Sequence, residues 1–130
     1  MNDTRQHQLG DLQFAIMRVL WERREATASE VHAALLAERG LAPTTIATML
    51  KKMEAKGVVD HRTEGRRFIY RPLVQEREVR RSMVRDLVSR LFQGDATALV
   101  NHLVTEKELD REEWLRLKAM LQEGEDQGNE

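Results

Sequence analysis

The fold of this chain is decided by residues 41–71, which read LAPTTIATMLKKMEAKGVVDHRTEGRRFIYR. Apolar residues recur at helical spacing over about residues 43–56, and Gly57 then supplies a stop, because glycine tolerates the left-handed backbone of a helix end. Residues 58–62 and 67–71 read as two short strands on either side of a glycine-containing turn. We therefore predict a helix that is followed directly by a β-hairpin.

The same stretch holds an excess of positive charge. It contains seven basic and three acidic residues, a balance of about +4, whereas the whole chain has a formal net charge of −1. The basic residues are Lys51, Lys52, Lys56, Arg62, Arg66, Arg67 and Arg71. Because a phosphate backbone attracts concentrated positive charge, we predict that this stretch contacts nucleic acid.

The predicted helix has two distinct faces. Ile46, Met49, Leu50 and Met53 are expected to point inward. The opposite face carries short hydroxyls and amines, namely Thr44, Thr45, Thr48, Lys51 and Lys52. Hydroxyls near a helix start can contact a base edge or a phosphate, and the lysines that follow can contact phosphates. An ordinary amphipathic helix with a polar surface would show the same two faces.

The predicted hairpin strengthens the DNA-binding interpretation. Arg62, Arg66 and Arg67 are expected near its tip, where they would contact phosphates. A two-stranded hairpin is marginal alone in water, so it must pack on the helices, through Val58, Phe68 or Tyr70. His61, in the first strand, is expected to face solvent or phosphate.

Two helices are predicted before this stretch. Residues 9–23 carry an apolar stripe at steps of three and four. Thr27 and Glu30 match a capping box that opens a second helix over about residues 28–38, and Gly40 ends it. This second helix should bury Val31, Ala34 and Leu35. Helix, glycine-containing turn, helix and hairpin together form a winged helix-turn-helix domain, which we assign to residues 1–73.

Residues after the hairpin are predicted to be helical, so the fold is mainly α with a small β-hairpin. We expect helices over residues 76–92, around Leu99–Val104, and from Asp110 to Gly124, and we expect a disordered tail over residues 125–130. These helices have no sheet to pack on, and a C2 homodimer built through residues 74–124 would cover them. A compact monomer is the alternative. The predicted interface or its supporting core consists of Leu87, Leu91, Leu103, Trp114, Leu117 and Leu121.

Several classes of function find no support in the sequence. There is no cysteine, no glycine-rich phosphate loop and no nucleophile elbow, and the four histidines are scattered. We therefore predict no enzyme activity, no catalytic residue, no cofactor and no metal site. No apolar run approaches the ~20 residues that a bilayer requires, and the N-terminus lacks a signal-peptide pattern. We expect a cytoplasmic protein that is not inserted in a membrane.

Motifs spread over residues 9–121 resemble the penicillinase repressors of the BlaI/MecI/CopY type. These motifs are IMRVLW at 16–21, TASEV at 27–31, PTTIATML at 43–50, EAKGVV at 54–59, YRPLV at 70–74 and LFQGD at 91–95. The resemblance implies a homodimeric winged-helix repressor that binds a palindromic operator in double-stranded DNA and dimerises through its C-terminal helices. Copper-responsive members use C-terminal cysteines, which this chain lacks.

The resemblance also implies how repression ends. Penicillinase-type members are inactivated by cleavage between an asparagine and an aromatic residue, and the matching bond here is Asn101–His102, with histidine in the aromatic position. The protease would be a membrane sensor metallopeptidase or another protease. Two other functions fit a winged helix: a regulator released by a small ligand in the dimer interface, and a protein–protein assembly module. The basic stretch argues against the assembly module.

Overall fold

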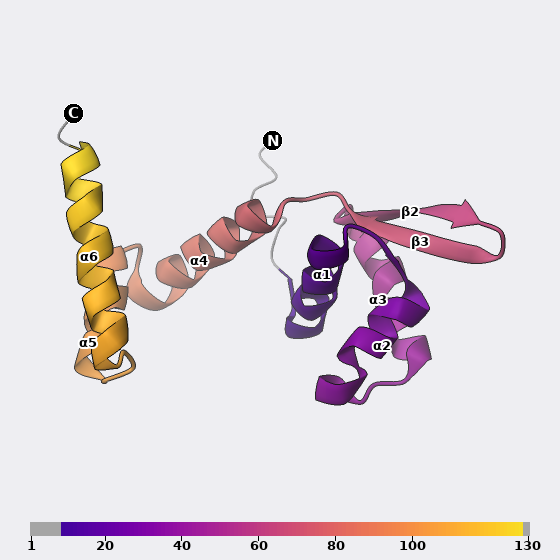
Figure 1. Ribbon diagram of the computed structural model, residues 1–130, viewed down its shortest axis with the longest axis horizontal. Helices are drawn as coiled ribbons and strands as arrows, with labels where there is room; N and C mark the ends of the chain where they lie inside the picture. The colour runs from indigo at the N-terminus through magenta and orange to yellow at the C-terminus, as the bar shows by residue number, and fades with distance from the viewer. Residues whose placement is uncertain (1–8, 129–130) are drawn as a thin grey trace. The chain divides into compact units, whose positions relative to one another are not determined.

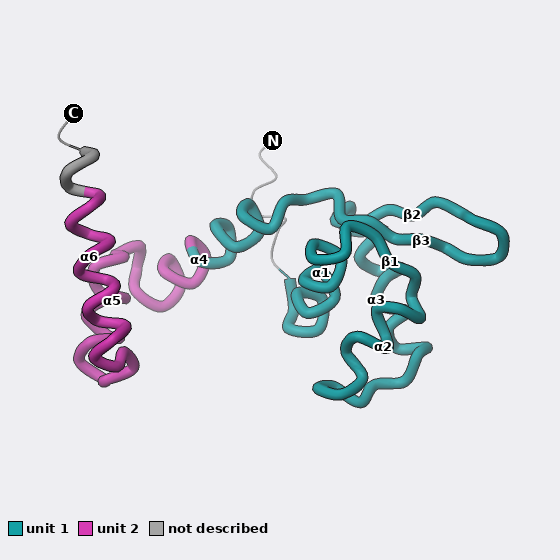
Figure 2. Tube along the Cα trace, in the orientation of Figure 1, with its two compact units in different colours: residues 1–84 teal, residues 85–130 magenta. Residues whose placement is uncertain are grey.

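The computed structural model describes residues 9–128 and contains six helices and three short strands in that range (Figure 1). The chain divides into two compact units, unit 1 (residues 1–84) and unit 2 (residues 85–130), which Figure 2 colours separately. The strands and the first three helices belong to unit 1. Among the described helices, none combines the length and the apolar character that crossing a membrane requires. Mainly helical structure with a small sheet confirms the predicted fold class.

The first three helices lie close to their predicted bounds, although α1 begins at Asp11 and not at residue 9. They are α1 (Asp11–Arg23), α2 (Ala28–Arg39) and α3 (Pro43–Lys56). At the start of α2, the Glu30 N–H donates to the Thr27 hydroxyl (3.1 Å) and the Thr27 N–H donates to the Glu30 carboxylate (2.8 Å), which is a complete capping box. Gly40 (φ 60°) ends α2 and Gly57 (φ 89°) ends α3 in left-handed conformations.

The hairpin belongs to a three-stranded antiparallel sheet. Its strands are β1 (Ala26–Thr27), β2 (Val59–Glu64) and β3 (Arg67–Pro72), in the order β1-β3-β2. In the register of β2 with β3, Asp60 lies opposite Arg71 and Glu64 opposite Arg67, so a two-residue turn joins the strands. Strand β1 pairs Ala26 with Tyr70 and was not predicted, because two residues show no alternation.

Unit 1 is built on one hydrophobic core. Its fully buried side chains come from all three helices, the sheet and the start of α4 (Glu76–Phe92); they are Ile16, Met17, Leu20, Val31, Ile46, Leu50, Met53, Val58, Val59 and Val79. The Trp21 indole N–H donates to the Val74 carbonyl (2.9 Å), which ties α1 to the segment that leads into α4. One expectation was wrong, because Ala34 is exposed. The hairpin packs on the core through Val58 and Tyr70, as predicted; it also buries Ile69, while Phe68 stays 44% exposed.

Unit 2 consists of the end of α4 and the helices α5 (Ala96–Thr105) and α6 (Arg111–Gly128). Gly94 (φ 84°) separates α4 from α5, and Asp95 caps α5 by accepting from the Ala98 N–H (3.2 Å). Asp110 and Glu113 cap α6 reciprocally: the Glu113 N–H donates to the Asp110 carboxylate (2.8 Å) and the Asp110 N–H to the Glu113 carboxylate (3.0 Å). The predicted start of the last helix at Asp110 is therefore confirmed, whereas α5 begins at Ala96, three residues before the predicted Leu99.

The predicted end of the last helix at Gly124 was wrong, because α6 continues to Gly128. Gly124 is not among the glycines with positive φ. A glycine inside a helix costs ~1 kcal/mol relative to alanine but removes no backbone hydrogen bond, so its neighbours can carry the helix through it. The disordered tail predicted for residues 125–130 thus falls partly on this helix, and residues 129–130 lie outside the described residues.

Candidate nucleic-acid interface

Helix α3 presents one apolar face to the core and one polar face to solvent. Ile46, Leu50 and Met53 are each 0% exposed. All five residues predicted on the opposite face are exposed: Thr44, Thr45, Thr48, Lys51 and Lys52. No side chain caps the start of this helix, where the Thr45 N–H donates to the Ala42 carbonyl (3.1 Å). A helix N-terminus that carries hydroxyls and lies open to solvent is suited to an anion such as phosphate.

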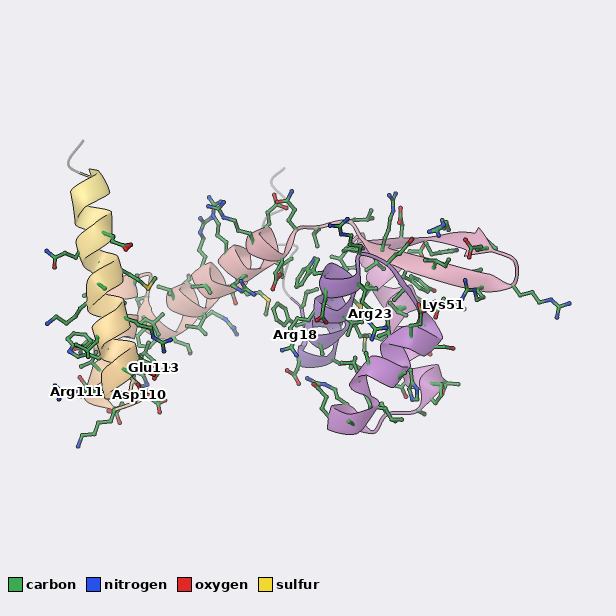
Figure 3. The ribbon with its side chains drawn as sticks, viewed as in Figure 1. Arg18, Arg23, Lys51, Asp110, Arg111 and Glu113 are labelled. Carbon is green, nitrogen blue, oxygen red and sulfur yellow. The ribbon has the colours of Figure 1, made fainter. Side chains whose placement is uncertain are left out.

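The polar face of α3 and the hairpin meet in a shallow groove. Its wall is formed by the start of α2, by α3, and by the turn and strand β3 of the hairpin. The lining residues are Thr27, Ala28, Ser29, Glu30, Ala47, Lys51, Arg66, Arg67, Phe68 and Tyr70. Figure 3 labels Lys51 on α3. Three of the predicted DNA contacts, Lys51, Arg66 and Arg67, therefore line one groove, although they come from two elements of the fold.

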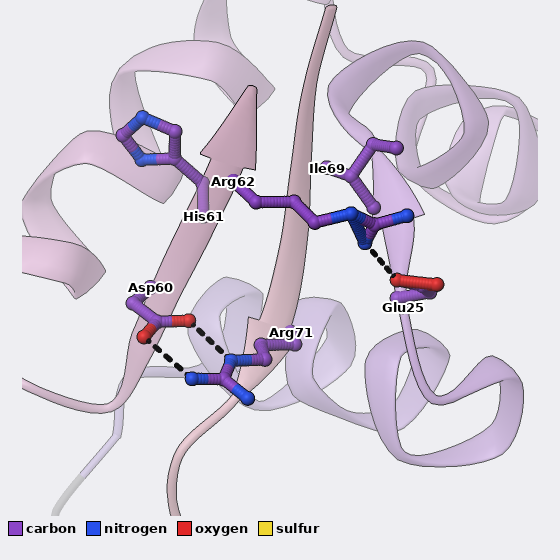
Figure 4. Close-up of a pocket in the computed structure, with 6 residues that line it drawn as sticks. All are labelled: Glu25, Asp60, His61, Arg62, Ile69 and Arg71. Carbon is purple, nitrogen blue, oxygen red and sulfur yellow. Dashed lines mark hydrogen bonds and ion pairs between the residues drawn. The ribbon is translucent and has the colours of Figure 1, made fainter. Parts of the chain in front are cut away.

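Arg62, the remaining predicted wing contact, does not line this groove. It lies in a second hollow, together with Glu25, Asp60, His61, Ile69 and Arg71 (Figure 4). The Arg62 guanidinium forms an ion pair with Glu25, from the turn before β1, and a longer one (3.4 Å) with Glu64. This wing arginine is thus held by carboxylates in the structure.

The other ion pairs of the hairpin follow its register. The Arg71 guanidinium donates twice to the Asp60 carboxylate, at 2.7 and 3.1 Å, and Arg67 donates to Glu64 at 2.9 Å. These hydrogen bonds lower the pKa of Asp60, through Arg71, and the pKa of Glu64, through Arg67 and then Arg62. Both carboxyl groups therefore stay charged at neutral pH. Arg66 forms no ion pair with any residue that the structure describes.

His61 fastens the hairpin to α3. Its Nδ1 lies 2.8 and 3.0 Å from the two carboxylate oxygens of Glu54, and its ring stacks on Phe68 with centroids 4.1 Å apart. The expectation that His61 faces solvent or phosphate was wrong, because its side chain is only 26% exposed and is bound to α3. Nothing in the sequence marked Glu54 as its partner, since the contact forms only when the chain folds back after Gly57.

The structure gathers no metal-binding cluster within residues 9–128: no group of three or more His, Asp or Glu side chains could hold an ion. The histidines have other roles. His32 donates from Nε2 to the Leu41 carbonyl (2.7 Å), and His102 lies edge-on to the Phe92 ring with centroids 5.8 Å apart. His7 lies outside the described residues.

The residues predicted for dimerisation are apolar side chains on the surface of unit 2. Leu87, Leu91, Trp114 and Leu121 are 36%, 62%, 38% and 60% exposed, while Leu103 and Leu117 are half-buried. The prediction omitted other exposed apolar side chains of the same unit; these are Val100, Val104, Leu115 and Met120. Asn101 and His102 are exposed within helix α5, so the bond between them has helical backbone.

Comparison with known proteins gives concordant matches. The sequence model of the family described as "Penicillinase repressor" matches residues 9–123. The chain is 34% identical over 110 residues to the transcriptional regulator BlaI of Mycobacterium tuberculosis (strain ATCC 25618 / H37Rv), which covers 83% of this chain and 80% of that protein. It is 28% identical over 116 residues to the penicillinase repressor of Bacillus licheniformis, which covers 89% of this chain and 91% of that protein. The solution structure of the DNA binding domain of the repressor BlaI is similar, with 34% identity and a TM-score of 0.50 over 55% of this chain and 87% of that one.

Proposed function

Because the chain belongs to the penicillinase repressor family, whose relatives are named as repressors and regulators, we propose that it is a homodimeric transcriptional repressor that binds a palindromic operator. Its ligand is double-stranded DNA, and it acts in the cytoplasm. In this proposal residues 1–73 read the DNA and residues 74–124 join two copies, so that each half of the operator receives one winged helix.

The observation that carries the DNA-binding proposal is the groove that α3 shares with the hairpin. Thr45 and Thr48 lie on the exposed face of α3 and are proposed to approach the bases, with Thr44 beside them. The basic side chains around them are proposed to hold the phosphates, which fixes the position of α3 in the major groove. These basic residues are Lys51, Lys52, Arg66 and Arg67, with Arg62 in support.

The DNA-binding proposal is tested with Thr45→Ala. An operator is first selected from a random duplex pool by the full-length protein, and affinity is then compared on this operator and on random DNA. If Thr45 contacts a base, the variant loses ~1–3 kcal/mol on the operator alone. Thr97→Ala, which removes an exposed hydroxyl from α5, is the matched control and should leave both affinities unchanged.

Equal losses of Thr45→Ala on the operator and on random DNA would make Thr45 a phosphate contact and contradict its proposed role in base readout. Failure of the wild-type protein to bind any duplex would contradict the repressor proposal itself.

Release from DNA is proposed to follow loss of the dimer, through cleavage at Asn101–His102 by a membrane sensor metallopeptidase or another protease. The cut would separate residues 1–101, which contain the whole winged helix, from the exposed apolar surface of α6. Because the bond lies within α5, this helix must open locally before a protease can bind it in extended form.

The release proposal is tested by the operator affinity of a 1–101 truncation beside the full-length protein. A tethered second winged helix binds at an effective concentration on the order of millimolar, so losing the tether should weaken operator binding by orders of magnitude. A truncation that still dimerises and binds as tightly would show that cleavage here is not the switch.

A further inference from the structure

We infer that Glu25 and Glu64 limit the affinity of the hairpin for DNA by occupying arginines that would otherwise contact phosphates. This inference rests on the proposed DNA-binding function. The two carboxylates are inferred to change the affinity for DNA of any sequence, whereas the threonines of α3 are proposed to distinguish one DNA sequence from another.

The charge of the hairpin is largely compensated within the fold. The hairpin holds four arginines, Arg62, Arg66, Arg67 and Arg71, and two acidic residues, Asp60 and Glu64. Glu25 adds a third carboxylate through its ion pair with Arg62, so four positive charges face three negative ones and a net charge of +1 remains. Only Arg66 has no carboxylate partner among the described residues. The basic character of the hairpin is therefore much weaker in the fold than in the sequence.

The partner of Arg62 comes from a distant part of the chain. Glu25 lies in the turn between α1 and β1, and pairing of β1 with β3 brings this turn beside the hairpin. The Glu25 and Arg62 side chains are 46% and 54% exposed, so water and ions reach the pair freely. An exposed ion pair contributes little to stability, because water and salt screen it, so Glu25 is not needed to hold the fold together. Its main electrostatic effect falls on Arg62.

Phosphate and carboxylate compete for the same guanidinium group. When DNA approaches, Arg62 must either leave Glu25 or contact a phosphate beside another negative charge, and both reduce the gain from the contact. A contact made by a free arginine releases one counterion and adds ~0.9 to the slope of log affinity against log salt. Removing the Glu25 charge should therefore leave Arg62 with only its longer ion pair to Glu64 (3.4 Å) and free it to contact a phosphate.

The experiment compares Glu25→Gln with the wild-type full-length protein on a labelled duplex of random sequence, by fluorescence anisotropy between about 50 and 200 mM salt. We expect the variant to bind about three- to tenfold more tightly near 0.1 M salt, the gain that releasing one counterion gives, with a salt slope steeper by ~0.9. The matched control is Glu22→Gln, which removes an equal charge from exposed α1 residue Glu22, a side chain that forms no ion pair within the described residues.

A second comparison assigns the gain to Arg62. In an Arg62→Gln background, Glu25→Gln should have no more effect than Glu22→Gln, because the arginine that it frees is absent. Unchanged thermal melting of each variant shows that the fold is intact.

Four results would overturn the inference. Equal gains in affinity from Glu25→Gln and Glu22→Gln would mean that the effect comes from the net charge of the protein and not from the Glu25–Arg62 pair. Weaker binding of Glu25→Gln would make Glu25 a residue that positions Arg62 on DNA. If the wild-type protein binds no duplex, the proposed function fails and this inference falls with it, whereas binding that Glu25→Gln leaves unchanged overturns the inference alone.

Discussion

Unit 1 and unit 2 differ in how far their apolar side chains are buried. In unit 1, ten large side chains are less than 2% exposed and form one core that draws on every element. In unit 2, the only buried hydrophobic among the described side chains is Val88, at 9% exposed, while leucines, valines and a tryptophan remain on the surface. Unit 1 thus buries most of its large apolar side chains in its own core, although Leu36, Phe68, Leu73 and Val84 stay exposed. Unit 2 presents the kind of apolar surface that marks an interaction site.

The largest expected effect concerns the exposed surface of unit 2. Leu121→Asp should dissociate the proposed dimer, because each copy loses ~1.5–3 kcal/mol of burial and gains a charge in the interface. Light scattering over a range of concentrations measures the solution mass, which should fall to that of a monomer.

Gln122→Asp, an equal charge one residue further along α6, is the control for Leu121→Asp and should leave the mass unchanged. A variant with aspartate at position 121 that stays a folded dimer would place the interface elsewhere.

Shortening a core side chain of unit 1 should lower the stability of the unit and leave the oligomeric state of the protein unchanged. Leu20 is fully buried, so Leu20→Ala should destabilise unit 1 by ~2–5 kcal/mol, which chemical denaturation measures.

Leu36→Ala is the matched control for Leu20→Ala, because Leu36 is 50% exposed in the same unit, and it should cost less than ~0.5 kcal/mol. Similar costs at the two positions would contradict the difference in burial on which the comparison rests.

A smaller effect is expected at the start of α2. Thr27→Ala removes the hydroxyl that accepts from the Glu30 N–H and should destabilise unit 1 by ~1 kcal/mol. Ser29→Ala, at a neighbouring exposed position with no capping bond, should change the denaturation midpoint much less. A midpoint that is equally insensitive to both changes would mean that the hydroxyl bond does not stabilise the helix.

The pH dependence of the same cap has a definite sign. The hydrogen bond from the Thr27 N–H lowers the pKa of Glu30 below its ordinary value of 4.5. A group whose pKa is depressed in the folded state contributes stability above its unfolded pKa and loses it as the pH falls through the folded pKa. The stability difference between wild type and Glu30→Gln should therefore shrink below about pH 4.5. The cost of Thr27→Ala should not follow this trend, because a hydroxyl does not titrate there.

The smallest expected change is a gain in stability at Arg24. This residue ends α1 with φ 76°, a conformation that side chains other than glycine rarely adopt. Arg24→Gly should relieve the strain and raise stability by about 1 kcal/mol or less, because the greater freedom of glycine in the unfolded chain offsets part of the gain. Arg23→Gly, inside the last turn of the same helix, should destabilise instead. A loss of stability in both variants would mean that the Arg24 side chain contributes more than its backbone strain costs.

Local signals explain most of the agreement between sequence and structure. Thr27 with Glu30, Gly40, Pro43 and Gly57 located the ends of α2 and α3, because caps and left-handed glycines act over a few residues. Two strand-like runs on either side of a glycine-containing turn predicted β2 and β3, although β2 continues to Glu64. Strand β1 was not predicted, because a two-residue strand is defined only by its pairing with β3. Gly124 was misleading for a related reason: glycine permits a helix to end but does not require it.

The sequence predicted which residues form the proposed DNA-binding surface, but not which of them form ion pairs or hydrogen bonds with one another. The exposed threonines and lysines of α3 follow from helical periodicity alone. The partners of Arg62 and His61 do not, because Glu25 and Glu54 reach them only through the turn of the sheet and the fold-back after Gly57. Sequence patterns show which charges are present; which of them neutralise each other depends on contacts between distant residues.

The two tryptophans of the chain fall one in each unit. Trp21 is half-buried and donates its indole N–H to the Val74 carbonyl, whereas Trp114 lies 38% exposed on α6. Each unit consequently carries its own intrinsic fluorophore. In a Trp114→Phe protein the emission reports the winged helix alone, and in a Trp21→Phe protein it reports the C-terminal helices. Melting of the winged helix and separation of the proposed dimer can therefore be followed independently, each by the intrinsic emission of one unlabelled single-tryptophan variant.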